Sequence, residues 1–377
     1  CERSHHLCVA PTFLQNGRAL WAIVDLTEGT LVGVRWTDLG TVTGTATAPT
    51  EKELQDEVVT REFCEKSNEL LRDGWRLDYI LTSSDGLRIS DVTFQGKAVL
   101  ESAKLVDWHV SYSREEGFGY SDAIGCPTFS QAAVVAFNGP QVETILRAEK
   151  AVGFALSQAY KSEFWPAPCN YYYSQRYEFY LDGHFRVAFA NHGRGCGNNG
   201  TYRPVVRIVP ANAQHFAQWD GATWQPWLVE QWIGPLEQST PEGYQFRVLT
   251  GEGDGYYVAP GQGQFLDGGR GDNPYLYVTR RHQAGEGPDE GESDLITIGP
   301  CCNTNHEHGP EKFIDPTPET IDGAPLVLWY VAQMANDDTP GQEYCWADTK
   351  LVDGIYVPVD YPCFAGPSFT PIVRKEP

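Results

Sequence analysis

The feature that most constrains the fold is an aromatic hairpin pattern between residues 166 and 207. Polar and aromatic residues alternate over Arg176–Tyr180, which is typical of a half-buried strand. An Asp-Gly pair follows within 181–184, and it favours a tight turn because it tolerates positive φ angles. Residues 185–189 then read as a return strand. The sequence therefore predicts a long β-hairpin, which is entered through Asn170-Tyr171-Tyr172-Tyr173.

Composition extends this prediction to the rest of the chain. The 377 residues include 38 Gly and 25 Pro, and 12% are aromatic, which favours short strands and turns over helices. Residues 326–332 form a continuous apolar run, which is typical of a central strand. Residues 117–127 are expected to be irregular, and 142–162 fit either a helix or a buried strand. We expect a mainly β protein with a large core.

One segment near the N-terminus is predicted to be helical. Thr50-x-x-Glu53 is a capping box, and apolar residues follow it on one broad face. The helix should continue to about Arg72, because Gly74 lies just beyond as a stop signal. Short strands are expected before it, at 19–25 and 30–35. We therefore predict a small α+β unit over residues 1–72 and a large β domain over 73–377.

Charge and cysteine content restrict the partners and the compartment. The net charge of −22 argues against nucleic acid or an anionic membrane as a partner of this acidic protein. No run of about 18 apolar residues exists, so no transmembrane span is expected. The 10 cysteines are an even set without Cys-x-x-Cys pairs, which indicates several disulfides in an oxidising compartment. An extracellular, periplasmic or cell-surface location follows, but the disulfide pairing does not.

Two interpretations of Cys1 stay open. Either it carries the lipid of a mature lipoprotein, which would anchor the protein to a membrane surface, or it belongs to a processed N-terminus and is available for a disulfide. The sequence does not decide between them.

The hairpin resembles the copper-containing quinone amine oxidases. Their motif is Asn-Tyr-acid-Tyr, followed by a strand, an Asp-Gly or Asn-Gly turn and a return strand, and residues 170–173 are similar to it with Tyr172 at the acidic position. Residues 74–100, 274–280 and 326–330 are similar to other strands of that family, in the same order. Over about residues 72–345, the resemblance implies a large distorted two-sheet β-sandwich, the family's supersandwich, usually in a homodimer.

The resemblance also implies roles for three residues. Tyr171 matches the tyrosine that this family oxidises in place to a quinone. Asp122 is the best candidate for the carboxylate that removes a substrate proton, and Tyr112 for the tyrosine that hydrogen-bonds the quinone. Without the resemblance, Asp122 is better interpreted as an ordinary turn residue and Tyr112 as a core or edge aromatic.

Copper in this family is held by three imidazoles, which suit Cu(II). The resemblance implies a His-x-His pair between residues 200 and 204 and a third histidine near Asn336, but no histidine stands at these positions. His306 and His308 are further candidate metal ligands, in a segment expected to be a loop because Gly-Pro pairs flank it, and His5-His6 is a weaker candidate. His184 and His192 are by default turn and loop residues.

The favoured hypothesis is a non-catalytic, amine-oxidase-like extracellular protein, a pseudoenzyme that serves binding or structural assembly. It would need no cofactor, and its partner would be a second copy in a homodimer or another extracellular protein. The alternative is an active quinone-dependent primary amine oxidase with an unusual metal site. That enzyme would contain copper and a quinone derived from Tyr171, and would release aldehyde, ammonia and hydrogen peroxide. A third hypothesis is an unrelated β-rich extracellular protein.

Overall fold

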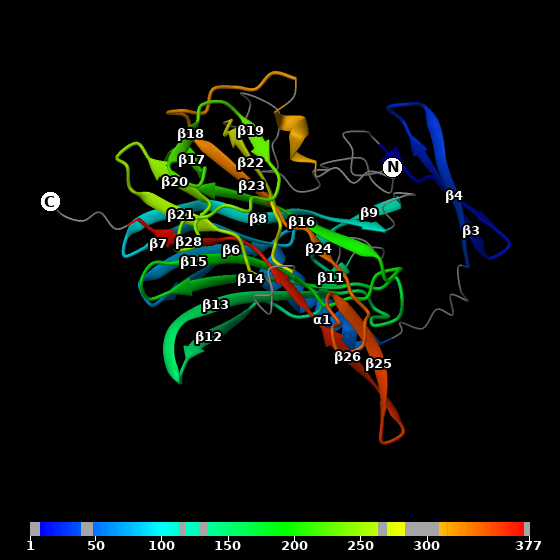
Figure 1. The fold of residues 1–377 in the computed structure, drawn as a ribbon. Coiled ribbons are helices and arrows are strands. Elements are labelled where there is room, and N and C mark those ends of the chain that lie inside the picture. The colour runs from blue at the N-terminus through cyan, green and yellow to red at the C-terminus, as the bar shows by residue number, and fades with distance from the viewer. Residues whose placement is uncertain are drawn as a thin grey trace. The chain divides into compact units, whose positions relative to one another are not determined.

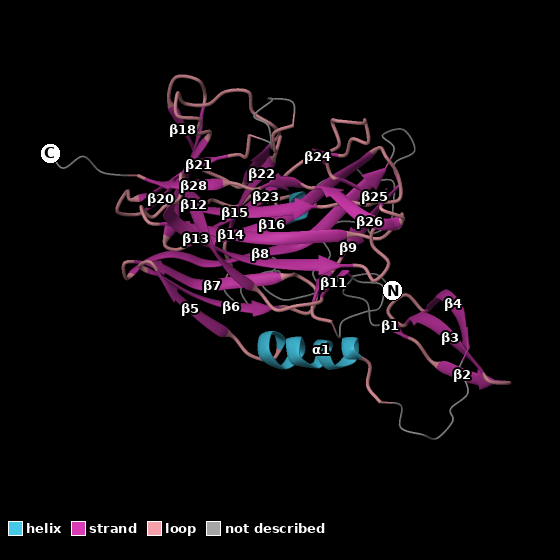
Figure 2. Cartoon of the chain, turned by 90° about the horizontal axis from the view of Figure 1, so that it is seen from below, coloured by secondary structure: helices cyan, strands magenta, loops and turns pink. Residues whose placement is uncertain are grey.

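The computed structural model describes residues 8–38, 48–112, 118–127, 134–262, 270–282, 309–314 and 316–372. Strands dominate throughout, which confirms the predicted mainly β fold class (Figures 1 and 2). The chain divides into two compact units, Cys1–Leu54 and Gln55–Pro377. None of the described helices has the length and apolar character needed to cross a bilayer.

The first unit contains a four-stranded antiparallel sheet. β3 lies in its interior and pairs with each of the other strands. The strands predicted at 19–25 and 30–35 are confirmed, as β3 and β4. The strands are β1 Cys8–Val9, β2 Thr12–Gln15, β3 Arg18–Asp25 and β4 Thr30–Asp38.

The predicted capping box is confirmed at the start of α1 (Glu51–Val59). The main-chain N–H of Thr50 donates to Glu53 Oε2 over 2.7 Å, and the N–H of Glu53 donates to Thr50 Oγ1 over 3.2 Å. Each residue thus satisfies a donor that the helix leaves unpaired at its N-terminus.

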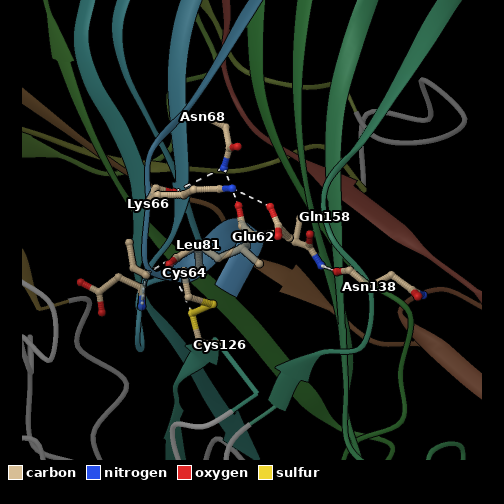
Figure 3. The surroundings of a disulfide bond; sticks show 11 residues. Glu62, Cys64, Lys66, Asn68, Leu81, Cys126, Asn138 and Gln158 are labelled. Atoms are coloured by element: carbon tan, nitrogen blue, oxygen red, sulfur yellow. Dashed lines mark hydrogen bonds and ion pairs between the residues drawn. A yellow bond between two sulfur atoms is a disulfide. The ribbon is translucent and has the colours of Figure 1, made fainter. Parts of the chain in front are cut away.

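The predicted helix end near Arg72 is wrong, because the helical segment ends with a π-helical turn, η1 (Thr60–Cys64). Asn68 Nδ2 donates to the carbonyl oxygen of Glu62 over 2.9 Å, and Cys64 is disulfide-bonded to Cys126 (Figure 3). The next residues form the strand β5 (Asn68–Arg72), which pairs with β6 (Trp75–Leu81). Pairing with a strand that comes later in the sequence therefore overrides the local helical pattern.

Two large sheets make up the body of the second unit and pack against each other (Figure 1). Within the described residues the first has twelve strands, in the order β10-β11-β13-β14-β15-β28-β21-β20-β17-β18, with β12 on β13 and β27 on β15. The second has ten, in the order β19-β22-β23-β16-β8-β7-β6-β5, with β24 on β16 and β9 on β8. This arrangement is the predicted two-sheet sandwich.

The strands of the first large sheet are β10 Ile124–Gly125, β11 Val134–Ala136, β12 Gln141–Arg147, β13 Lys150–Lys161, β14 Tyr172–Tyr180, β15 Phe185–Asn191, β17 Ala213–Trp219, β18 Trp224–Trp227, β20 Phe246–Thr250, β21 Gly255–Ala259, β27 Cys363–Ala365 and β28 Ser368–Pro371. Those of the second, besides β5 and β6, are β7 Leu87–Phe94, β8 Lys97–Tyr112, β9 Phe118–Asp122, β16 Gly200–Pro210, β19 Gln231–Ile233, β22 Tyr275–Arg280, β23 Leu326–Val331 and β24 Met334–Ala335. The short helix η2 (Pro310–Phe313) precedes β23, and the hairpin β25 (Trp346–Val352) and β26 (Ile355–Tyr361) forms a separate two-stranded sheet.

The structure settles one ambiguous segment and shows that one prediction was wrong. Residues 142–162, which fitted a helix or a strand, lie in the antiparallel hairpin of β12 and β13. Residues 117–127, expected to be irregular, contain β9 and β10, because each finds a neighbouring strand to pair with. The predicted domain boundary at 72/73 stays a prediction. The first compact unit ends at Leu54, and β5 belongs to the ten-stranded sheet of the second unit.

The two sheets are joined through the inner face of β14, in which alternate side chains are buried. The Gln175 amide accepts from the main-chain N–H of Leu87 over 2.6 Å and donates to its carbonyl oxygen over 3.2 Å. Tyr177 OH donates to the same carbonyl over 2.7 Å. In the other direction, Trp75 Nε1 donates to Tyr180 O over 2.9 Å. Hydrogen bonds as well as apolar contacts therefore connect the two sheets.

Gly366 lies in the turn between β27 and β28, where a larger residue should be destabilising. Gly366 has φ +132°, and a Cβ at this position would overlap the main-chain oxygen of Val187. We expect Gly366→Ala to destabilise the protein by about 1–3 kcal/mol from backbone strain alone, and by more because the strand must shift. The measurement is the midpoint of urea unfolding. Gly234→Ala is the control, because its Cβ would meet Tyr275 at an ordinary 3.5 Å. Equal midpoints for the two variants would contradict the prediction.

Candidate functional site

Tyr171 lies just before β14 and packs in the core between the sheets, with 7% of its surface exposed. Its ring stacks on that of Tyr173, with centroids 5.5 Å apart. Tyr173 in turn stacks on Trp108 of β8, with centroids 4.2 Å apart and planes 10° apart. Because β8 belongs to the other sheet, the three rings form a stack that crosses from one sheet to the other.

Asp122 ends β9 and lies opposite Trp108 in the antiparallel register of β8 and β9. Tyr173 OH donates to Asp122 Oδ2 over 2.7 Å. Burial, and then the charge of Asp122, raise the pKa of Tyr173 well above its usual range, so its phenol stays neutral and remains a donor. The structure thus brings the sequence-predicted Asp122 and Tyr171 to one cluster, in which both contact Tyr173.

The remaining sequence-predicted site residues are only partly described. The main chain of Tyr112 pairs with Gly200 and Phe118 at the end of β8, and its side chain lies outside the described residues. His306, His308 and Cys1 also lie outside the described residues.

A disulfide closes the entrance of the hairpin. Cys169 is bonded to Cys196, and Tyr171 OH lies 3.9 Å from the sulfur of Cys196. The side chain of Asn170 donates to Ala167 O and Pro168 O over 3.2 and 3.1 Å, so it holds the turn that leads into β14. With Cys64–Cys126 and Cys345–Cys363, this bond confirms the prediction of several disulfides.

The positions that the resemblance assigns to copper carry other chemistry. Arg203 Nε donates to Gln333 Oε1 over 2.6 Å, and its Nη1 donates to Ser111 Oγ. Asn336 accepts from the N–H of Gly200 over 2.8 Å and donates to a loop carbonyl over 3.0 Å. A guanidinium and an amide do not fit Cu(II), which takes imidazole nitrogens in such a site.

Elsewhere in the described ranges, no group of three or more His, Cys, Asp or Glu side chains could hold a metal ion. This statement does not extend to residues 283–308, which lie outside them and include His306 and His308.

A second polar cluster lies on the opposite, outer face of β14, and sequence reasoning missed it. His192 stacks on Tyr172 with centroids 3.9 Å apart, and hydrogen-bonds both Ser174 and Asp360. The hairpin pairing that places His192 beside β14 was predictable. Asp360 was not, because it comes 168 residues after His192 in the sequence.

The hydrogen bond from the buried phenol of Tyr173 to Asp122 should contribute to stability. We expect Tyr173→Phe to lower the free energy of unfolding by about 1.5–3 kcal/mol, because the Asp122 carboxylate loses a charge-assisted donor. Tyr180→Phe is a matched control on the same strand, since its hydroxyl donates to Glu178 over 2.9 Å in a half-buried position. The control should lose less than about 1 kcal/mol. Urea unfolding followed by fluorescence measures both, and a larger loss in Tyr180→Phe would contradict the prediction.

No family model and no curated protein matches this chain. Among solved structures, it is similar to a copper-containing benzylamine oxidase from Hansenula polymorpha, with a TM-score of 0.46 and 12% identity over 96% of this chain and 77% of that one. It is also similar to an amine oxidase of Aspergillus nidulans, with a TM-score of 0.46 and 11% identity over 97% and 68%. The lysyl oxidase of Pichia pastoris gives 0.46 and 12% over 97% and 69%. At these values the similarity assigns no activity, substrate or partner to this chain.

Proposed function

We propose that this chain is a non-catalytic, amine-oxidase-like protein that serves binding or structural assembly outside the cytosol. The observation that carries the proposal is the packing of Tyr171. A residue that forms a covalent bond with a substrate needs an open path to its ring. Here the ring is 7% exposed and stacks on Tyr173, and its hydroxyl lies 3.9 Å from a disulfide sulfur. These contacts favour a structural role for Tyr171.

The side chains at the assigned copper positions support the same proposal. The guanidinium of Arg203 is a fixed positive charge, which opposes a bound cation. The amide of Asn336 is already engaged with Gly200 and a loop carbonyl. In the resembling family, copper oxidises the precursor tyrosine, so a site without imidazoles leaves Tyr171 an ordinary tyrosine.

One observation favours the alternative, an active quinone-dependent primary amine oxidase. Asp122 and Tyr171 both contact Tyr173, so a carboxylate lies near the precursor position as that chemistry requires. The metal ligands of such an enzyme would then come from residues that do not match the family pattern.

Two further features support a location outside the cytosol and an assembly role. The three disulfides among the described residues are typical of an oxidising compartment. The hairpin of β25 and β26, which we call the arm, extends away from the sandwich (Figure 1).

The arm has the properties of an interface. An isolated two-stranded hairpin is marginally stable in water, and five apolar side chains near its tip are 40–72% exposed, namely Leu351, Val352, Ile355, Tyr356 and Val357. Clustered exposed apolar groups mark contact sites. We propose that a second copy of this chain covers the arm, in a two-fold dimer like that implied by the sequence resemblance.

The absence of amine oxidation is tested with protein produced and incubated with copper. We expect no hydrogen peroxide release from primary amines and no coloured adduct with phenylhydrazine, because Tyr171 stays unmodified. Tyr171→Phe is the control for background signal. Peroxide release that is present in the unaltered protein and lost in Tyr171→Phe would establish the alternative instead.

The arm dimer is tested by sedimentation of full-length protein. We expect the double variant Leu351→Asp, Ile355→Asp to weaken self-association by about 100-fold or more, because two charges would be buried in an apolar contact. Leu146→Asp is the matched control, since Leu146 is a similarly exposed leucine, at 63%, on the β12–β13 hairpin. An unaltered protein that stays monomeric at high concentration, or an equal effect of the control, would refute the dimer.

A further inference from the structure

A serine hydroxyl lies at the surface of the first large sheet. Because side chains alternate along β14, Ser174 faces away from the core in which Tyr171 and Tyr173 are buried. Its neighbours in register are Ala159 on β13 and Ala190 on β15. Ala159 is exposed and Ala190 is buried, so the half-buried hydroxyl of Ser174 is open on the β13 side. Ser174 also lines an open groove of about 1180 Å³ on this face.

A histidine is held against this hydroxyl. His192 follows β15, and its Nε2 lies 3.0 Å from Ser174 Oγ. The ring stacks on Tyr172, with centroids 3.9 Å apart and planes 9° apart, so its orientation is fixed. His192 is 9% exposed, so its ring is packed among its neighbours.

A carboxylate orients the histidine. Asp360, near the base of the arm, lies 2.7 Å from His192 Nδ1 through its Oδ2. The hydrogen bond from His192 lowers the pKa of Asp360, so the carboxylate is ionised and can only accept. Nδ1 therefore carries the proton of the neutral ring, and Nε2 is free to accept the proton of Ser174.

We propose that Ser174, His192 and Asp360 form a nucleophile, base and carboxylate triad that transfers the acyl group of small uncharged esters. A hydrogen-bonded nucleophile and base, with the base oriented by a third group, is the arrangement that activates a serine. It arises here on a strand face, from the hairpin of β14 and β15 and from Asp360, which is 168 residues away from His192 in the sequence.

The reaction balances without a redox partner. Ser174 Oγ bonds to the ester carbonyl carbon while its proton moves to His192 Nε2. The ester C–O bond then breaks, and the leaving alcohol takes that proton. A water molecule next gives a proton to Nε2 and its hydroxyl to the acyl carbon, which releases the acid, and Ser174 regains its proton from His192.

The side chains around Ser174 determine the substrate class. The exposed methyl group of Ala159, opposite Ser174 in register, gives room for a small acyl group. The nearest cation along the strand, Arg176, is already paired with Glu178 over 2.8 Å and Glu143 over 2.6 Å, so it offers no free charge to an anionic substrate. Phe364 lines the same groove and gives an apolar surface for the alcohol portion.

This site is independent of the proposed function, because it lies on the opposite face of β14 from Tyr171. The competing explanation is structural, in which the hydrogen bonds only attach the arm to the sheet through Asp360. A structural role needs the hydrogen bonds but not a reactive hydroxyl, so chemical reactivity distinguishes the two explanations.

The experiment uses the full chain, a fluorophosphonate probe and p-nitrophenyl acetate. We expect the probe to label Ser174, identified by peptide mapping, and p-nitrophenyl acetate to give a burst of about one equivalent of phenolate. Asp360→Asn and His192→Ala should each slow labelling by about 100-fold or more, since general base catalysis contributes at least that factor. Ser157→Ala is the matched control and should label as the unaltered protein does. Ser157 shares this groove on β13, but its hydroxyl is bonded to Arg176.

Two results would overturn the proposal. The first is the absence of label on Ser174 in the unaltered, folded protein. The second is labelling of Ser174 that proceeds as fast in Asp360→Asn as in the unaltered chain, which would assign the hydrogen bonds to attachment of the arm. Circular dichroism checks that each variant is folded, and Ser174→Ala, which removes only the nucleophile, must lose the burst.

Discussion

Hydrogen bonds from side chains on the inner face of β14 to the main chain of Leu87 hold the two sheets in register. The Gln175 amide accepts a hydrogen bond from the N–H of Leu87 and donates one to its carbonyl oxygen, and Tyr177 OH donates to the same oxygen. A buried polar group without a partner costs about 1–3 kcal/mol. A shift of β14 by one residue would leave these groups unpaired and place the core aromatics in solvent. The contact therefore fixes both the packing of the two sheets and the direction in which every side chain of β14 points.

Both candidate sites follow from that alternation. The inner face places Tyr173 in the stack that joins Tyr171 to Trp108, and it connects the stack to Asp122. The outer face places Ser174 beside His192, and the arm brings Asp360 to the same point. One strand thus supports a buried cluster with structural contacts and, on its other face, a partly buried cluster with the geometry of an activated serine. The resemblance implies roles for residues of the first cluster, whereas the proposed nucleophile belongs to the second.

Local patterns in the sequence predict much of the fold. The Asp-Gly turn, the alternation in β14 and the capping box at Thr50 each depend on residues that are close in sequence, and the structure contains all three. Partners distant in sequence explain what local patterns miss. Residues 68–72 form a strand because β6 pairs with them. Asp360 lies beside His192 because the arm carries it there. The stack around Tyr173 was similarly hidden, since Asp122 reads as a turn residue until β9 pairs with β8.

The mass of the peptide that contains Tyr171 distinguishes a core residue of the sandwich from a quinone precursor. The protein would be produced with copper in an oxidising compartment, then reduced, digested and analysed by mass spectrometry. We expect an unmodified tyrosine in essentially all molecules, because the ring is enclosed between the sheets and the assigned copper positions carry Arg203 and Asn336. An oxidised Tyr171 that appears only when copper is supplied would contradict this expectation.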